Sequence, residues 1–379
     1  MVLVNVQQEQ LLVQQLKKYC SLCKYCFDRH VTISVFNRIS TINDDKCDIC
    51  HGLMSQSDSI IEKTVATIID KNYEFDTFLI GATLPAQLYE REDQIRSRFK
   101  IRGKENIKKQ LTRILGAKFA KITRRRVDYI IPDIVINLFI NKQNYVDITI
   151  KARSVIVAGR YLKKCRGLPQ KQTKCRECIG KGCVVCDNSG LSGYNSVEGI
   201  IAKELMSITK GQNPKFLWIG SEDHDSLVLG KGRPFFVRIS NPKIRTFKRN
   251  LKVGSDGIYA IINGKLDSLP DSLIQFITKT KILVQSETPL VKDSLKKLNT
   301  LGESAIEFES KSKMVKKKIY YLSAKKINDN RFSLTIVADS GITIKQLVGG
   351  QEYMKPNVSE IIGTKCECIW FDILDVQIQ

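Results

Sequence analysis

The chain has 379 residues, which predicts two or three domains of ordinary size. Apolar residues make up 42% and charged residues 26%, a balance that excludes wholesale disorder, and no apolar run approaches the ~18 residues of a membrane span. Lysine and arginine number 61 against 39 aspartate and glutamate, so the net charge of +22 favours a polyanionic partner, nucleic acid above all, over general basicity of the proteome. The first residues lack the basic and small-residue features of a signal peptide, so we expect a cytoplasmic protein without membrane contacts.

Two CxxC pairs near the N-terminus predict a metal site. The four cysteines are Cys20, Cys23, Cys47 and Cys50. Thiols of a cytoplasmic protein stay reduced, and two such pairs can supply four thiolates to one tetrahedral zinc ion. Four thiolates leave no open coordination position, so the predicted zinc is structural. Cys26 and His51 lie nearby in the sequence and are candidate substitutes for one ligand.

Residues 75–158 have the pattern of an α/β domain. Apolar residues at helical spacing from Ile107 predict a helix that stops at Gly116. The turn residues 141–144 join two alternating runs into a predicted hairpin. The segments expected to be strands are 75–81, 134–138, 146–150 and 154–158. The basic cluster 124–126 is either a binding element or a solvated turn.

The segment 159–170 combines basic residues with one tyrosine. Its candidate RNA-binding residues are Arg160, Tyr161, Lys163, Lys164 and Arg166. Such a composition suits a phosphate backbone together with a stacked base. The segment also follows a predicted strand, a position where loops often carry binding residues.

A second cysteine cluster occupies twelve residues. Its members are Cys175, Cys178, Cys183 and Cys186. With glycines between them, these residues can wrap one zinc ion as a small knuckle, and the alternative is a reduced or redox-labile thiol cluster. The glycine-rich stretch is also the best candidate for a domain boundary.

The remaining chain alternates strands, turns and helices. Asn195 and Glu198 resemble a capping box that opens a helix running to about Ile208. A strand is expected at 257–262, where Asn263-Gly264 gives a turn signal, and another at 332–338.

An acidic cluster marks the candidate site for chemistry. Glu222, Asp223, His224 and Asp225 are consecutive, and a glycine-rich basic segment with Lys231 and Arg233 follows. One interpretation is a divalent-metal site of a phosphodiesterase, for which the three histidines of the chain are too few. A second is an acidic turn without a role. The third is a single carboxylate that acts as nucleophile or base on a flipped base, with Lys231 and Arg233 near phosphates.

The order of these motifs resembles the archaeal and eukaryotic family of THUMP-containing tRNA pseudouridine synthases that act on uridines 54 and 55 of the T-arm. Besides the N-terminal CxxC pairs, the matching segments are 78–81, 92–93, 159–161, 166–170, 196–198, 222–225, 229–235, 241–245, 288–289 and 341–345. These segments span nearly the whole chain. Their joint order is specific, whereas most of them alone are not.

The resemblance implies roles for four residues. Asp223 matches the catalytic aspartate, and Tyr259 matches a tyrosine that stacks on the target base. Lys345 matches a basic residue that pairs with Asp223, and Ile344 an aliphatic residue that lines the base pocket. A buried aspartate beside Lys345 is expected to stay ionised at neutral pH. Breaking the glycosidic bond of uridine and remaking it at C5 needs one carboxylate, so no catalytic cofactor is expected.

We therefore expect an α/β (α+β) protein in four parts: a zinc-bearing region at 1–68, a THUMP-like RNA-binding domain at 69–170, a cysteine knuckle at 171–190, and a pseudouridine synthase domain on a mostly antiparallel sheet at 191–379. The expected function is tRNA pseudouridine synthesis by a monomer that carries structural zinc. Departures from the family pattern, such as Ser221 in place of an arginine, motivate an alternative. That alternative is a non-catalytic zinc-containing RNA-binding protein or tRNA chaperone on the same scaffold.

Overall fold

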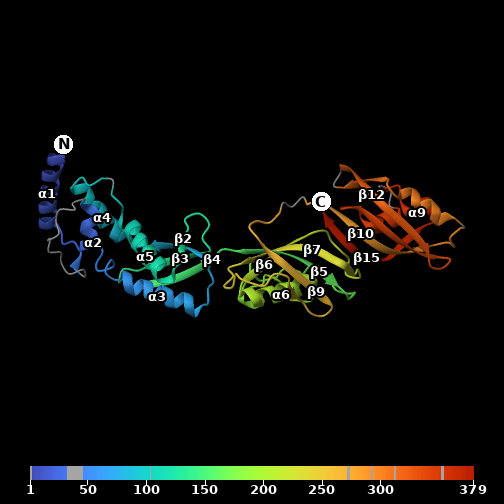
Figure 1. Ribbon diagram of the computed structural model, residues 1–379, viewed down its shortest axis with the longest axis horizontal. Coiled ribbons are helices and arrows are strands. Elements are labelled where there is room, and N and C mark those ends of the chain that lie inside the picture. The colour runs from blue at the N-terminus through green and yellow to red at the C-terminus, as the bar shows by residue number, and fades with distance from the viewer. Residues whose placement is uncertain are drawn as a thin grey trace. The chain divides into compact units, whose positions relative to one another are not determined.

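The computed structural model describes residues 2–31, 46–102, 104–270, 274–291, 293–310, 313–350 and 354–379 (Figure 1). The chain divides into two compact units, Met1–Arg153 and Ser154–Gln379. The division falls just before β5 (Val155–Lys163), which pairs with strands of the second unit. The segment 154–170, expected in the THUMP-like domain, therefore lies in the second unit, and so does the cysteine-rich stretch 171–190.

The first unit contains a four-stranded sheet covered by helices. Its helices are α1 (Val2–Tyr19), α2 (Lys24–His30), α3 (Ser57–Asp70), α4 (Ala86–Arg98) and α5 (Ile107–Thr123). Its strands are β1 (Thr77–Thr83), β2 (Arg126–Val127), β3 (Ile134–Ile140) and β4 (Val146–Ala152), in the order β2-β1-β3-β4. β1 runs parallel to β2 and β3, and β3 and β4 form the predicted antiparallel hairpin.

The helix α5 continues beyond the predicted stop at Gly116. A glycine inside a helix costs about 1 kcal/mol relative to alanine, which packing can offset. Phe119, one turn further on, is fully buried and contacts Phe78 of β1 with ring centroids 4.6 Å apart. The aromatic contact and the good helix formers that follow Gly116 carry the helix to Thr123.

The second unit is built on one long sheet, flanked by short helices. Its strands are β5, β6 (Gln212–Trp218), β7 (Val228–Ser240), β8 (Leu251–Val253), β9 (Ile258–Leu266), β10 (Phe276–Ser286), β11 (Ala305–Ser310), β12 (Lys313–Lys326), β13 (Arg331–Asp339), β14 (Met354–Lys355) and β15 (Cys366–Ile378). Its helices are η2 (Val184–Cys186), α6 (Val197–Thr209), α7 (Ser294–Lys297), η3 (Leu298–Leu301), α8 (Ile344–Gly349) and α9 (Val358–Ile362).

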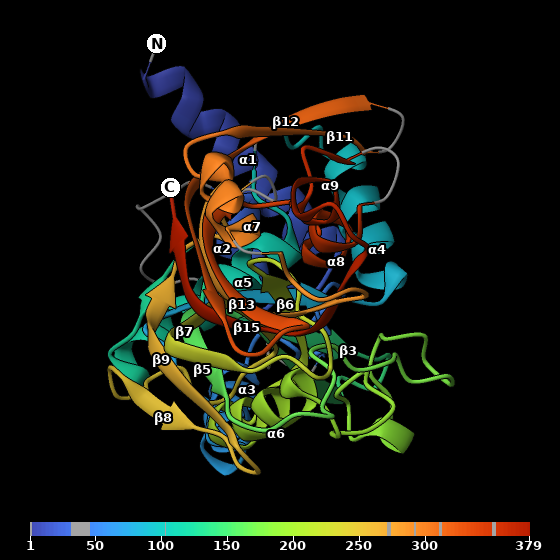
Figure 2. The same cartoon turned by 90° about the vertical axis from the view of Figure 1, so that its right-hand side faces the viewer.

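The strand order in the described residues is β14-β11-β12-β13-β10-β15-β7-β5-β9-β8, with β6 paired to β7. The pairings are antiparallel except for a single parallel contact between β15 and β7. This confirms the predicted mostly antiparallel sheet. Figure 2 shows α6 near the β5–β9 end of the sheet and α7, α8 and α9 near the β10–β13 end.

Two local predictions in the second unit differ from the structure. The cap of α6 is Ser196, whose side chain accepts a hydrogen bond from the Gly199 backbone N–H, and not Asn195. The strand β9 runs through Asn263-Gly264 instead of turning there. A register shift opposite Ala158/Gly159 absorbs Asn263 as a β-bulge, so the turn-forming residues bend the strand without ending it.

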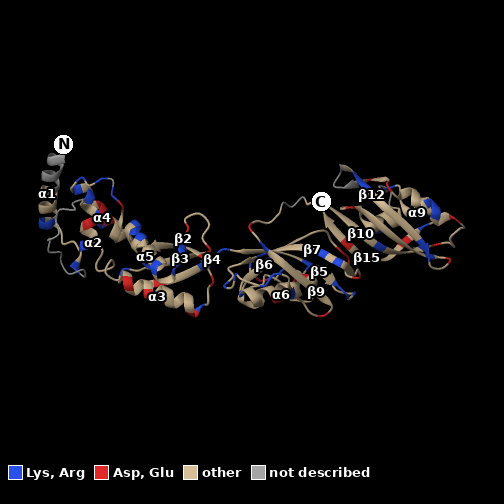
Figure 3. Ribbon diagram, viewed as in Figure 1, with Lys and Arg blue, Asp and Glu red and all other residues tan. Residues whose placement is uncertain are grey.

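Basic residues are spread over both units (Figure 3). Among the described residues, no helix is long and apolar enough to cross a membrane.

Candidate active site and metal centres

Asp223 and Lys345 form an ion pair in the second unit. Asp223 lies in the loop between β6 and β7, Lys345 lies at the start of α8, and Lys345 Nζ is 2.6 Å from Asp223 Oδ2. The hydrogen bond to Asp223 raises the pKa of Lys345 above its ordinary 10.5, so the ammonium group is charged at neutral pH. The Asp223 side chain is 42% exposed and the Lys345 side chain 62%, so the expectation that Asp223 is buried is wrong. The carboxylate is thus reachable from solvent while it holds a cation.

The ion pair borders a cavity of about 440 Å³. Ile344 also lines this cavity, and the remaining walls come largely from β10, β13 and β15. The aromatic lining residues are Phe276 and Phe371. The volume is within the range of roughly 300–1,000 Å³ typical of ligand sites. A partly apolar cavity with the carboxylate of Asp223 in its lining suits a flat, neutral base that has left its stack.

Glu222, the residue before Asp223, anchors the loop between β6 and β7 in a buried ionic cluster. The hydroxyl of Tyr161 donates to Glu222 Oε2 at 2.8 Å, and Arg233 Nε lies 3.3 Å from the same oxygen. Lys163 Nζ lies 3.8 Å from Glu222 Oε1. Burial raises the pKa of Glu222 above 4.5, and the positive charge of Arg233 opposes this shift most strongly. Arg233 packs closely against Gly220, where a Cβ would lie 2.4 Å from Arg233 Nη1. The φ of Gly220 is +80°, which also favours glycine at this position.

Two basic side chains hold the backbone of the same loop. Lys163 is fully buried, and its ammonium group donates to the carbonyls of residues 223 and 224 at 3.2 and 2.9 Å. Arg166 donates to the carbonyl of Asp225 and forms a bidentate pair with Asp372 of β15 at 2.8 and 2.9 Å. The position of Asp223 is therefore fixed by contacts to β5, to the segment after it and to β15.

The structure separates the residues predicted to bind RNA into three groups. Tyr161, Lys163 and Arg233 have fully buried side chains that contact Glu222, which disfavours the RNA contacts predicted for them. They fall on the inward face because alternate residues of a strand point to opposite sides of the sheet. Arg160 and Arg166 are partly exposed. Arg160 donates to backbone carbonyls, and both guanidinium groups form ion pairs with carboxylates of β15. Lys164 and Lys231 are exposed, and their contacts with RNA stay a prediction.

The structure does not bring Tyr259 into the cavity beside Asp223. Lys163 and Ile258 are partners across β5 and β9, and Lys163 reaches the Asp223 loop from the buried face. Tyr259 follows Ile258 and therefore points to the opposite face, where it is 51% exposed and lines a separate cavity. Tyr259 thus lies outside the lining of the cavity beside Asp223, and its expected stacking on the target base stays a prediction. Phe276 and Phe371 are the aromatic residues that line the cavity beside Asp223. No local sequence motif predicts them, because the pairing of β10 with β15 brings them together.

The N-terminal cysteines gather into one cluster in the first unit. The ligand atoms of Cys23, Cys26, Cys47 and Cys50 lie within 4.8 Å of one another, and all four residues are buried. The sulfur atoms of Cys23 and Cys50 are 3.6 Å apart, close to the ~3.8 Å edge of a tetrahedron with ~2.3 Å metal–sulfur bonds. The cluster could therefore hold a metal ion.

Cys26 takes the place predicted for Cys20. Cys23 caps α2 and its sulfur accepts from the Cys26 backbone N–H at 3.5 Å, so one helical turn puts both thiols on the same side. The Cys20 thiol instead donates to the Leu16 carbonyl at 3.4 Å, and burial raises its pKa to about 11. The exposed His51 is not part of the cluster.

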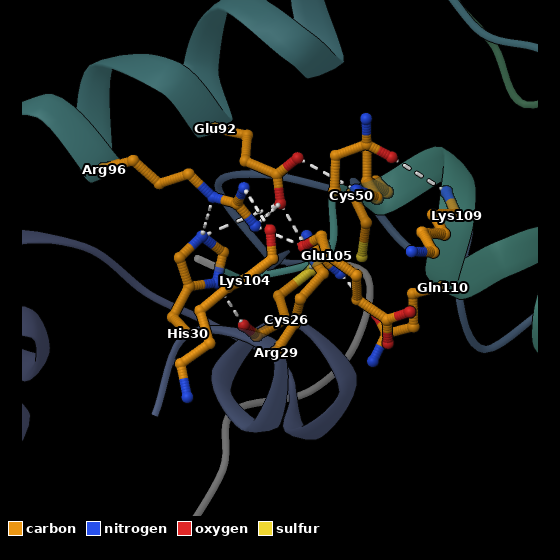
Figure 4. Close-up of polar contacts among 12 residues, drawn as sticks. Cys26, Arg29, His30, Cys50, Glu92, Arg96, Lys104, Glu105, Lys109 and Gln110 are labelled. Atoms are coloured by element: carbon orange, nitrogen blue, oxygen red, sulfur yellow. Dashed lines mark hydrogen bonds and ion pairs between the residues drawn. The ribbon is translucent and has the colours of Figure 1, made fainter. Parts of the chain in front are cut away.

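A buried polar network supports this cluster. Glu92 of α4 accepts from Arg29 at 2.5 Å and lies 3.3 Å from Arg96, and its other oxygen accepts from the backbone N–H of Ile107 (Figure 4). Arg29 also donates to the Cys26 sulfur at 3.5 Å. Burial lowers the pKa of the neighbouring His30 to about 4, so this imidazole is neutral at neutral pH. The network ties Cys26 to the N-terminus of α5.

The second cysteine cluster forms a compact knuckle in the second unit. The ligand atoms of Cys175, Cys178, Cys183 and Cys186 lie within 4.8 Å of one another. Three pairs of its sulfur atoms, Cys175–Cys183, Cys178–Cys186 and Cys183–Cys186, are 3.7 to 4.0 Å apart, again close to the edge of such a tetrahedron. Although desolvation acts against ionisation, the N–H groups of Cys183 and Gly190 help lower the pKa of Cys186 to about 6, which favours a thiolate. This cluster could also hold a metal ion.

Comparison with known proteins gives matches over both units. Residues 156–377 match the family model "Pus10, C-terminal", and residues 61–138 match "Pus10 THUMP domain, archaeal". The chain is 32% identical over 380 residues to the tRNA pseudouridine synthase Pus10 of Nitrosopumilus maritimus, covering 97% of each chain. It is also 32% identical to the protein of that name from Methanocaldococcus jannaschii, over 88% of this chain and 76% of that one. A solved Nop10–Cbf5 complex of an archaeal box H/ACA particle shares 9% identity over 56% of each chain, with a TM-score of 0.29.

The family matches define an enzyme of the pseudouridine synthase class. The mostly antiparallel sheet and the cavity that Asp223 lines agree with this class. The expected family resemblance is thereby confirmed. The chain belongs to the Pus10 family. Its THUMP match lies within the first unit and its "Pus10, C-terminal" match within the second.

Proposed function

We propose that the protein isomerises uridine 54, uridine 55 or both in the T-arm of tRNA, with Asp223 as the nucleophile. The observation that carries this proposal is the position of Asp223. Its carboxylate pairs with Lys345 at the edge of a cavity that Phe276 and Phe371 line. The relatives named tRNA pseudouridine synthase support tRNA as the substrate.

The proposed reaction needs no group from outside the chain and the RNA. The N1–C1′ bond of uridine breaks, the base turns within the cavity, and a bond forms between C5 and C1′. The proton lost from C5 is balanced by the proton gained at N1, so no atom enters or leaves. Asp223 supplies the carboxylate for this exchange, and the ammonium group of Lys345, 2.6 Å away, orients that carboxylate.

The cavity fits an extruded base better than a base within a helix. Removing a base from its stack costs a few kcal/mol, which contacts in the pocket must offset. Phe276 and Phe371 offer ring surfaces for this purpose, and Ile344 adds an aliphatic contact. Thr278 and Thr280 of β10 lie in the same lining and offer hydroxyl groups to the edge of the base.

We infer that both cysteine clusters hold zinc in a structural role. Four thiolates in a tetrahedron are the usual ligands of structural zinc and leave no site for a reacting group. The protein then acts in a reducing compartment, the cytoplasm, as a monomer. The N-terminal zinc would stabilise the start of the first unit, where Arg29 and Glu92 already link Cys26 to α4.

A site-resolved modification assay tests the proposal. Unmodified tRNA transcript is incubated with the purified protein, labelled with a carbodiimide that marks pseudouridine, and read by primer extension. The expected result is a stop that reports position 54 or 55 and disappears when both uridines are replaced by cytidine. Pseudouridine only at other positions, or none at all, would contradict the proposal.

A further inference from the structure

The inference concerns one hydroxyl group in the lining of the cavity beside Asp223. Thr280 lies on β10 and belongs to this lining. We propose that its hydroxyl forms a hydrogen bond with the flipped uracil both before and after the base turns, so that Thr280 is a substrate-binding residue of the reaction. The inference rests on the proposed function, because it takes uridine as the nucleotide that enters the cavity.

Strand register places Thr280 on the cavity face of the sheet. Its cross-strand partners are Ile336 on β13 and Ile373 on β15, and both also line the cavity. Because side chains alternate along a strand, Thr278 shares this face, whereas the exposed Lys279 points to the opposite one. The Thr280 side chain is therefore directed towards the space in which the base would lie.

The neighbours of Thr280 on the cavity face are apolar. Ile336 is 1% exposed and Ile373 4%, and Ile282, the next residue of β10 on the same face, is fully buried in the core. Thr280 itself is 2% exposed. It is thus the last polar side chain of β10 before this face of the strand enters the core.

The Thr280 hydroxyl has no partner among the residues that the structure describes, since none of them forms a hydrogen bond with it. A buried hydroxyl without a partner costs free energy, whereas valine has the same branched shape, suits a strand equally well and buries no polar group. Thr278 is only half-buried, so water can bond with its hydroxyl. The contrast indicates that the partner of the Thr280 hydroxyl arrives with the substrate.

Uracil offers this hydroxyl a partner in either orientation. One edge of the base carries O2, N3–H and O4, which are two acceptors on either side of one donor. A half turn about the line through N3 and C6 exchanges N1 with C5, as the reaction requires, and it also exchanges O2 with O4. The edge therefore presents the same pattern before and after the turn. Because a threonine hydroxyl can both donate and accept, one hydroxyl can bond to the base in both orientations.

This contact leaves the chemistry of the reaction unchanged. The N1–C1′ bond breaks and the C5–C1′ bond forms without a proton passing through Thr280. The proton lost from C5 and the proton gained at N1 still balance. What the hydroxyl adds is a hold on the base during the interval in which no covalent bond joins it to the RNA.

The test removes the hydroxyl and keeps the shape of the side chain in the full-length protein. Thr280→Val should lower the single-turnover rate of pseudouridine formation at saturating enzyme at least fivefold, within the range of about 5- to 100-fold for a buried polar group left without its partner. Thr280→Ser should stay within about threefold of the wild-type rate, because it restores a donor and an acceptor.

A second measurement reports the base after its turn. A T-arm hairpin that carries pseudouridine at positions 54 and 55 contains the product base, and its binding is followed by fluorescence anisotropy. Thr280→Val should weaken this binding by about two- to tenfold, the effect of losing one hydrogen bond.

Thermal unfolding separates a substrate contact from a structural one. Since the hydroxyl has no partner in the described part of the fold, Thr280→Val should unfold at the wild-type temperature or above it. Thr335 on β13 precedes Ile336 and therefore faces away from the cavity, so Thr335→Val is the matched control. It should change neither the rate nor the binding of the hairpin.

Three results would overturn the inference. The first is a wild-type rate or wild-type hairpin binding for Thr280→Val. The second is a lower unfolding temperature for Thr280→Val, which would give the hydroxyl a role within the fold. The third is an equal loss of rate for Thr335→Val. Each of these leaves an active wild-type protein, whereas absence of pseudouridine formation by the wild type would contradict the proposed function and this inference with it.

Discussion

Lys345 Nζ lies 2.6 Å from Asp223 Oδ2 in the lining of a cavity, and neither side chain is buried. The pair joins a loop after β6 to a helix more than a hundred residues later in the chain. Because both groups are exposed to solvent, their attraction contributes little to folding, within about 0–1 kcal/mol. The geometry therefore points to a role in positioning charge and not in stability.

Replacement of Lys345 by alanine should separate these two effects. We expect the free energy of unfolding to change by less than about 1 kcal/mol, and the single-turnover rate of pseudouridine formation to fall about a hundredfold because the carboxylate loses its fixed cation. The exposed Lys365→Ala is the control and should change neither quantity. A normal rate for Lys345→Ala would remove Lys345 from the mechanism.

The same pair predicts behaviour at high pH. The pKa of Lys345 is raised in the folded protein, so its favourable interaction with Asp223 is complete below 10.5 and is lost only as the pH rises through the higher folded value. The rate should therefore not fall through loss of this pair between pH 7 and 9. A wild-type titration that disappears in Lys345→Ala within that window would contradict the assignment.

Arg233 should be required for stability, and more so at high pH. Its removal in Arg233→Met leaves Glu222 buried without its strongest positive neighbour, which typically costs about 3–5 kcal/mol. The folded pKa of Glu222 then rises further above 4.5, so the deficit should be small at pH 4 and grow as the pH rises through that folded value. Urea unfolding at several pH values measures it, and adding Glu222→Gln should flatten the pH dependence. A deficit independent of pH would argue against the buried pair.

Metal content distinguishes the N-terminal ligand set from its neighbours. Cys26→Ser should lose one zinc per chain and unfold the start of the first unit, because Cys26 lies within the cluster. Cys20→Ser should retain that zinc, because the Cys20 thiol donates to a backbone carbonyl. Elemental analysis of the purified variants gives the answer. Loss of zinc from Cys20→Ser but not from Cys26→Ser would restore the ligand set expected from the CxxC pair.

Lys164 and Lys163 are adjacent and should behave differently. Lys164 is exposed, so Lys164→Ala should make the log–log salt dependence of tRNA binding shallower by about 0.7–0.9. Lys163 is buried and holds the Asp223 loop, so Lys163→Ala should destabilise the protein without a direct effect on that slope. Equal changes in slope for both variants would contradict the burial of Lys163.

The sequence was informative where spacing or motif order determines structure. The β3–β4 hairpin and the chemistry-bearing segments around Asp223 and Lys345 follow from alternation and from the family motifs. The composition of the segment 159–166 was misleading, because counting basic residues does not show which of them face inward on β5. The ligand exchange between Cys20 and Cys26 depends on where α1 ends and α2 begins. Phe276 and Phe371 could not be found, since only the pairing of β10 with neighbouring strands brings them to Asp223.

The central claim is that Asp223 carries out the isomerisation. The most direct measurement is pseudouridine formation at positions 54 and 55 of a tRNA transcript by Asp223→Asn, with tRNA affinity measured on the same protein. Asparagine keeps the size of the side chain and removes the nucleophile, so we expect no product and wild-type affinity, whereas Asp225→Asn should retain most of the activity. Product formation by Asp223→Asn at the wild-type rate would contradict the account and make Asp225 the next candidate.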